Sequence, residues 1–96
     1  MSLVPEARKD DAGKPRFSLL PLPALRRVID VLEYGARKYE PHAWQRVPDA
    51  NVRYFDAAMR HLLAWKDGEQ HDSESGLQHL AHAACCVLFL LAGESG

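Results

Sequence analysis

The residues best suited to chemistry gather in and beside one short polar segment. The stretch from Glu69 to Gly76 reads EQHDSESG and lies between two apolar segments of helical periodicity. All five histidines of the chain fall between positions 42 and 82, and His61, His79 and His82 flank this stretch. A helical hairpin does not need so many titratable groups at its hinge. We therefore interpret the region as a chemical site and expect the chemistry to be metal-assisted.

Two carboxylates of this segment offer oxygen ligands. Glu69 and Asp72 have the spacing Glu-x-x-Asp, which directs both side chains to the same side when it falls on one helical turn. Oxygen ligands suit Mg²⁺ or Mn²⁺, ions that often bridge to the phosphates of a substrate. The spacing alone is a weak motif, and its place between two histidine-bearing helices strengthens it.

Two of the histidines lie one helical turn apart. His79 and His82 occur in an otherwise apolar segment, where imidazole rings are costly to bury unless both are hydrogen-bonded. They either bind a metal or a phosphate, with imidazole suiting Mn²⁺, Fe²⁺ or Zn²⁺ better than Mg²⁺, or form structural hydrogen bonds to a side chain such as Glu33 or Asp56. His61 has the same alternatives, because it lies on a helix face that also packs.

Basic and aromatic side chains are candidates to hold an anionic, planar ligand. Trp44 either plugs the hinge between two helices or stacks on a planar base. Arg60 either neutralises a leaving pyrophosphate or pairs with Asp56, four residues before it. Lys14 and Arg16 lie on a proline-punctuated arm. That arm either covers the core or carries both cations to a phosphate.

These side chains need helices to position them, and the pattern predicts an all-α fold of three main helices. Apolar residues recur at helical spacing over residues 23–39, 50–66 and about 75–92. Asp49 is the expected N-cap of the second helix and Gly68 its C-terminal stop. Ser75 and Gln78 fit a capping box at the start of the third helix.

An extended arm precedes the helices. Prolines interrupt residues 1–21 and disfavour a continuous helix there. We expect the arm to run across the helices, because Phe17, Leu19 and Leu20 would not be left in water.

Two positions of the first helix have alternative interpretations. Glu33 either forms an exposed ion pair with Arg37, four residues on, or serves as an acidic ligand. Gly35 costs about 1 kcal/mol relative to Ala inside a helix, so we expect another helix or a ligand to approach it closely.

Length and composition limit the class of protein. Residues 1–96 make one small domain that is 47% hydrophobic, and the third helix is apolar nearly all round. A helix of that kind is enclosed by other helices, and a domain of this size buries little more than about 60% of its unfolded surface. We therefore expect a homodimer or homotetramer that shares a core. The formal charge of -1 excludes a general nucleic-acid surface.

The cysteines and the apolar segments of the sequence indicate the cellular compartment of the protein. Cys85 and Cys86 are adjacent in an apolar helical run, where neighbouring side chains diverge, so we expect reduced core cysteines and a cytoplasmic protein. Residues 1–11 have no apolar stretch that would indicate a secretory signal. The apolar run over residues 77–92 is interrupted by polar residues and is too short to span a membrane.

Residues 9–91 resemble one family. The strongest phrases are GARKY at residues 35–39, RHLL at 60–63 and the run from Gly68 to His82. They resemble the N-terminal domain of the dATP/dGTP diphosphohydrolases often found in phage genomes, a group similar to the MazG-like all-α nucleotide pyrophosphohydrolases. The resemblance implies an oligomeric enzyme, located in the host cytoplasm if phage-encoded. It would hydrolyse a purine deoxynucleoside triphosphate to the monophosphate and pyrophosphate with Mg²⁺ or Mn²⁺.

The chain departs from the MazG-like pattern, which pairs Glu-x-x-Glu on one helix with Glu-x-x-Asp on a later one. The first motif is absent, with Asp30 and Glu33 the nearest acidic pair, and the later helix carries His79 and His82 instead of acids. Either the ligand set has been rebuilt or catalysis has been lost. The second alternative is a catalytically silent oligomerisation or nucleotide-binding module.

The predicted site combines the resemblance with the residue types. The predicted metal ligands are Glu33, Glu69, Asp72, His79 and His82, and the predicted catalytic residues are Glu69, Asp72 and His61. The phosphate chain is assigned to Lys14, Lys38 and Arg60, and the base to Tyr39 or Trp44. A third alternative is HD-type phosphohydrolysis, suggested by the doublet His71-Asp72. That match is weak, because the doublet lies in a turn and no clear distal aspartate follows.

Overall fold

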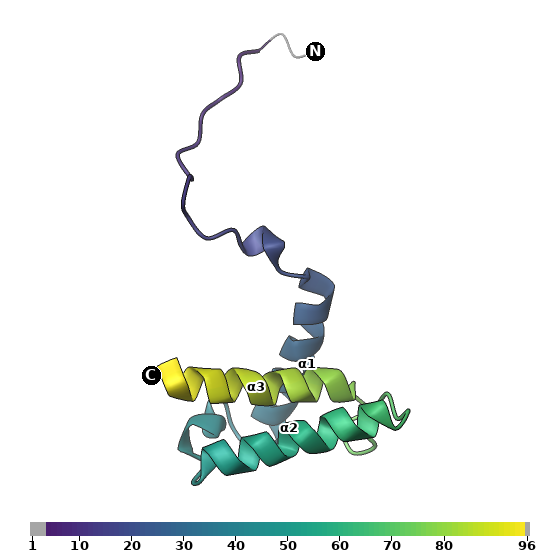
Figure 1. Ribbon diagram of the computed structural model, residues 1–96. Coiled ribbons are helices and arrows are strands. Elements are labelled where there is room, and N and C mark those ends of the chain that lie inside the picture. The colour runs from purple at the N-terminus through teal and green to yellow at the C-terminus, as the bar shows by residue number, and fades with distance from the viewer. Residues whose placement is uncertain (1–3, 96) are drawn as a thin grey trace.

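The computed structural model describes residues 4–95 and contains three α-helices, shown in Figure 1. They are α1 (Leu22–Lys38), α2 (Ala50–Lys66) and α3 (His79–Ser95), and two 3-10 turns, η1 (Phe17–Leu19) and η2 (Ala43–Arg46), precede α1 and α2. Within residues 4–95 the only β feature is an isolated antiparallel bridge between His71 and Gln78. The predicted all-α fold with three main helices is confirmed.

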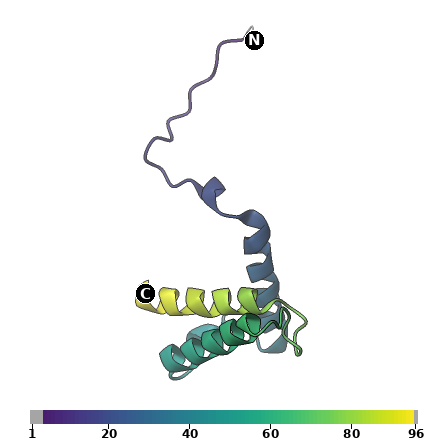
Figure 2. The same ribbon diagram turned by 45° about the vertical axis from the view of Figure 1, so that its right-hand side comes forward.

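The helices form an antiparallel pair crossed by a third helix. α2 and α3 run side by side in opposite directions, and α1 crosses them steeply near the N-terminal end of α3 (Figures 1 and 2). At the crossing, Val31 of α1 packs with Ala81 and Cys85 of α3. Cys85 and Cys86 are both free and buried, as predicted. Burial raises the pKa of the Cys85 thiol to about 12, so it acts as an inert core residue.

The end of α2 is fixed by its glycine. Gly68 has a φ of 99°, in the region where glycine carries no Cβ penalty. Its N–H donates to Trp65 O at 3.0 Å, and the Glu69 N–H donates to Ala64 O at 3.0 Å. This pair of bonds is a Schellman motif. The predicted stop at Gly68 is confirmed, and α2 covers the predicted residues 50–66.

Of the two predicted N-caps, Asp49 is confirmed in position and Ser75 is wrong. Asp49 occupies the N-cap position of α2 with a φ of 55°, and its side chain makes no capping hydrogen bond. The third helix begins at His79 and not near Ser75. The Ser75 hydroxyl accepts the Leu77 N–H at 3.1 Å, a local turn that competes with helix capping. Ser75 therefore shapes the preceding loop.

Backbone hydrogen bonds close residues 67–78 into a compact loop, called here the site loop. The Asp72 N–H donates to Leu77 O at 2.8 Å, and the His79 N–H donates to Gln70 O at 2.9 Å. Gly76 has a φ of 74° and donates to Asp72 O at 2.8 Å. The spacing of Glu69 and Asp72 thus does not fall on a helical turn.

The N-terminal arm does not run across the helices as expected. It extends away from the α2–α3 pair in Figures 1 and 2, and Phe17 is 74% exposed. The arm leaves from the start of α1, which carries a proline in its first turn. That end of α1 projects beyond the other two helices (Figure 1), so the arm has no helix surface beside it.

Apolar faces of α2 and α3 remain exposed in the single chain. The exposed apolar side chains of these two helices include Val52, Phe55, Met59 and Leu62 of α2 and Leu80, Leu88 and Leu91 of α3. A second copy covering these faces stays a prediction. Across residues 4–95, none of the helices combines the length and the apolar character needed to cross a membrane.

Candidate metal and nucleotide site

Three histidines meet where α2 and α3 face each other beside the site loop. The Nδ1 atoms of His61 on α2 and His79 on α3 lie 2.9 Å apart. The His61 ring also stacks on the ring of His82, with centroids 4.5 Å apart and planes 9° apart. His79 is only 5% exposed, and the other two are half-buried. The predicted convergence of histidines from two helices is present.

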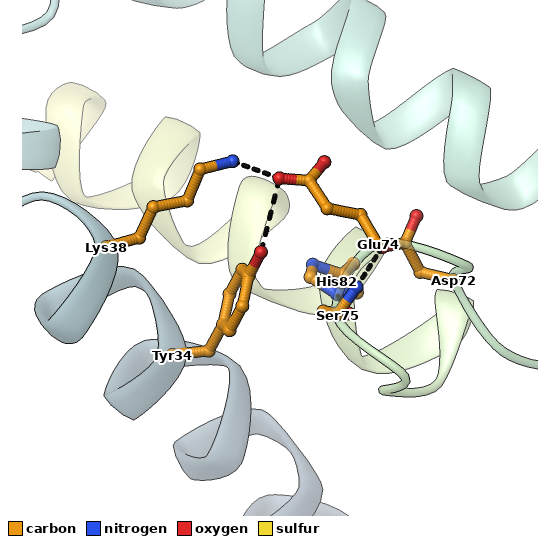
Figure 3. Close-up of polar contacts among 6 residues, drawn as sticks. All are labelled: Tyr34, Lys38, Asp72, Glu74, Ser75 and His82. Carbon is orange, nitrogen blue, oxygen red and sulfur yellow. Dashed lines mark hydrogen bonds and ion pairs between the residues drawn. The ribbon is translucent and has the colours of Figure 1, made fainter.

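Asp72 joins this cluster from the site loop. His61, Asp72 and His79 each offer one ligand atom, and these three atoms lie within 4.8 Å of one another. Burial opposes ionisation of the Asp72 carboxyl, but hydrogen bonds from Ser75 and the nearby rings of His82 and His61 outweigh it and lower the pKa. The Ser75 N–H donates to Asp72 Oδ2 at 2.9 Å (Figure 3). Asp72 is therefore an oriented carboxylate.

The histidines are prepared to act as neutral ligands. Burial lowers the pKa of His61, and the neighbouring His82 and His79 lower it further. Burial also lowers the pKa of His82, although Asp72 opposes this shift. A neutral imidazole offers a lone pair to a metal. Two imidazoles with one carboxylate fit Mn²⁺, Fe²⁺ or Zn²⁺ better than Mg²⁺.

Two further side chains lie next to the outer nitrogens of the rings. Glu69 Oε1 lies 3.3 Å from His79 Nε2, but the atoms are not aligned for a hydrogen bond, and this buried nitrogen has no hydrogen-bond partner among the described residues. Ser75 Oγ lies 2.7 Å from His82 Nε2. Ser75 Oγ also accepts the Leu77 N–H, so this hydroxyl contacts both the loop backbone and the His82 ring. A carboxylate behind a ligating histidine is the usual outer partner in metal sites.

A cavity of about 1160 Å³ opens beside the cluster, large enough for a nucleotide-sized ligand. Its walls come from the C-terminal half of α1, η2, α2 and α3. Eight of the predicted site residues line it, namely Glu33, Lys38, Tyr39, Trp44, Arg60, His61, Asp72 and His82. His79 and Glu69 lie at the back of the cluster. Lys14 precedes α1 in the N-terminal arm and is not among the residues that line the cavity.

Gly35 lies in the cavity wall. A Cβ added there would meet nothing within 4 Å, so the expected close approach of another helix is wrong. The cavity leaves that space open.

Glu33 was predicted either to pair with Arg37 or to serve as an acidic ligand, and the structure shows the ion pair. Its carboxylate lies 4.0 Å from the Arg37 guanidinium, and both side chains are exposed. Glu33 is not in the group of three that could share an ion. His71 of the HD doublet is exposed, bridges to Gln78 and is also outside that group.

The basic side chains of the cavity differ in their partners. Lys38 pairs with Glu74, whose carboxylate also accepts the Tyr34 hydroxyl at 3.2 Å (Figure 3). Arg60 lines the cavity and, within the described part of the chain, forms no ion pair with Asp56. Arg60 is therefore available to an anionic ligand.

The other end of the cavity is aromatic. Trp44 stacks on Phe89 with centroids 4.7 Å apart and planes 11° apart, and Tyr54 lies tilted 5.0 Å from Phe89. One face of Trp44 thus packs in the hinge, while the residue still lines the cavity. Tyr39 is exposed, and Lys38 Nζ lies 5.3 Å from its ring.

The sequence interpretation missed Glu74, Tyr34 and Phe89. Tyr34 and Lys38 are four residues apart on α1, a spacing that places both on one helix face. That spacing is the signal that could have grouped them. Nothing local connects Glu74 to α1.

The fold and site define a small all-α domain with a histidine and carboxylate cluster beside a cavity that carries cations and aromatic rings. The chain belongs to the family described as dATP/dGTP diphosphohydrolase, N-terminal, which it matches over residues 5–95. It is similar to a dATP/dGTP diphosphohydrolase of Salmonella phage PMBT28, with 38% identity over 82 residues. The match covers 85% of this chain and 28% of that protein. No solved structure matches the chain.

Proposed function

We propose that this domain holds a divalent metal and a purine deoxynucleoside triphosphate and takes part in hydrolysis to the monophosphate and pyrophosphate. The observation that carries the proposal is the convergence of His61, Asp72 and His79 within 4.8 Å, beside a cavity of suitable size. The family and the name of the phage relative support the substrate class.

The metal would be held by His61, Asp72 and His79, and either Mn²⁺ or Mg²⁺ remains the proposed ion, with the imidazoles favouring Mn²⁺. When bound, such an ion polarises a phosphoryl oxygen and lowers the pKa of a water. Glu69 would hold the His79 ring in place through the 3.3 Å contact at Nε2. Glu69 is thus better suited to positioning a ligand than to touching the substrate.

The remaining cavity residues would bind the two ends of the nucleotide. Arg60 and Lys38 line the cavity and would neutralise the charge that develops on the leaving pyrophosphate. At the other end, Trp44 or Tyr39 would stack on the base. In the reaction, water adds to the α phosphorus, the bond from that phosphorus to the bridging oxygen breaks, and pyrophosphate leaves.

The test is product analysis with a panel of deoxynucleoside triphosphates and either Mg²⁺ or Mn²⁺. We expect a nucleoside monophosphate and pyrophosphate from dATP or dGTP, and activity lost in His61→Gln. The matched control is His71→Gln, an exposed histidine outside the cluster, which should keep activity. Release of a deoxynucleoside and triphosphate, with activity lost in His71→Gln, would instead establish HD-type chemistry.

Absence of turnover has its own meaning. If neither ion supports hydrolysis and neither raises the melting temperature, the domain is the silent module and the proposal is wrong. A melting temperature that rises with Mn²⁺ in the natural chain and not in His61→Gln would support the metal site by a readout separate from activity.

A further inference from the structure

Glu74 connects the site loop to α1 through two side chains. Its carboxylate forms an ion pair with Lys38 and accepts the Tyr34 hydroxyl at 3.2 Å. Figure 3 shows Lys38 and Tyr34 pointing from α1 toward this carboxylate, with Asp72 and His82 on its other side. All five residues line the same cavity. The Glu74 carboxylate therefore belongs to the candidate site, although it remains open to solvent.

The pair is charged near neutral pH. Lysine and glutamate side chains are both ionised near pH 7 at their ordinary pKa values, and Lys38 and Glu74 form an ion pair. Burial, and then the nearby Glu74 carboxylate, raise the pKa of Tyr34, so its hydroxyl keeps the proton that it donates.

The pair is also weak enough to be exchanged. The side chain of Glu74 is 63% exposed, and an ion pair in that setting contributes about two- to fivefold to an equilibrium constant. The Lys38 ammonium and the Tyr34 hydroxyl can each donate a hydrogen bond either to a carboxylate oxygen or to a phosphate oxygen. A polyphosphate carries several such oxygens and can take both donors at once.

We propose that Lys38 and Tyr34 form a polyphosphate subsite whose internal counter-ion is Glu74, and that the ligand displaces this carboxylate when it binds. The assignment to a nucleotide's phosphates rests on the proposed function. Affinity for a polyphosphate alone does not depend on hydrolysis. Glu74 is thus a residue that sets affinity by competition, in addition to linking the site loop to α1.

The experiment is isothermal titration of the natural chain and its variants with inorganic tripolyphosphate in EDTA, so that neither metal nor turnover contributes. Glu74→Gln should bind about two- to fivefold more tightly, because the competing charge is gone. Lys38→Met should bind more weakly. Adding Glu74→Gln to Lys38→Met should bring a smaller gain than Glu74→Gln brings alone, because only the Tyr34 hydroxyl is then left to be freed.

The matched control is Glu40→Gln. Glu40 lines the same cavity, its side chain is 62% exposed, and it pairs with Arg46. The Glu40→Gln variant removes the same charge from the same cavity without freeing Lys38. Its gain in affinity for tripolyphosphate should therefore be smaller. An equal gain in Glu40→Gln, or unchanged or weaker binding in Glu74→Gln, would overturn the proposal. Tighter binding in Glu74→Gln without hydrolysis by the natural chain would leave the subsite intact and refute only the proposed function.

Discussion

Replacing Asp72 with asparagine separates the two roles of this carboxylate. Asp72 Oδ2 accepts the Ser75 N–H at 2.9 Å, which holds the site loop, and the carboxylate also faces the His61 and His79 ligand atoms. Asparagine keeps an oxygen that can accept the same hydrogen bond but removes the charge. Stability and metal affinity should therefore respond by different amounts.

The two magnitudes follow from these contacts. A hydrogen bond to a charged group contributes about 1.5–3 kcal/mol and a neutral one about 0.5–1.5 kcal/mol, so the free energy of unfolding should fall by about 1 kcal/mol. Such a loss lowers the melting temperature by about 4–8 °C in a domain of this size. Mutation of a residue that only hydrogen-bonds to a metal ligand already lowers metal affinity about 10–100-fold. Loss of the direct ligand Asp72 should therefore lower Mn²⁺ affinity at least about 100-fold.

The assay is calorimetric titration with MnCl₂ beside urea denaturation in EDTA. Asp67→Asn is the matched control, because Asp67 is an exposed carboxylate of the same loop outside the metal group. It should leave Mn²⁺ affinity unchanged. If Asp72→Asn loses about 1 kcal/mol of stability and binds Mn²⁺ like the natural chain, Asp72 is only a loop anchor and our reasoning about the ligand set is refuted.

Three further predictions concern the loop, the cavity wall and acid. Ser75→Ala removes contacts to His82 Nε2 and the Leu77 N–H and should cost about 1–3 kcal/mol in urea denaturation; a loss under about 0.5 kcal/mol would contradict these bonds. Gly35→Ala meets open space and should raise the free energy of unfolding by up to about 1 kcal/mol, whereas a loss would reveal a close neighbour. In EDTA, stability should fall as the pH drops below 6.5, because His61 and His82 have folded pKa values below that ordinary value and the unfolded chain takes up protons first. Urea midpoints that stay constant from about pH 7.5 to 5 would contradict those pKa directions.

Local patterns predicted the helices better than their connections. α2 matches its predicted range because an apolar period and Gly68, with its positive φ, both act within a few residues. The start of α3 was placed too early because the Ser75 hydroxyl serves the site loop and His82. That choice depends on bonds between residues 70–72 and 77–79, which no capping pattern contains.

The histidine cluster could be predicted, but the way it is supported could not. His79 and His82 are one turn apart on one helix, and His61 falls on the face that packs against them. The Lys38 and Glu74 pair joins residues 36 positions apart, so only the crossing of α1 over the site loop brings them together. The arm shows the same limit, because its apolar residues indicate burial without indicating which surface receives them.

The most direct test of the metal site is anomalous diffraction at the manganese edge from crystals grown with MnCl₂. We predict one strong peak bonded to the imidazoles of His61 and His79 and to the Asp72 carboxylate. No peak within bonding distance of these three side chains, or a peak bound only elsewhere on the chain, would contradict the account.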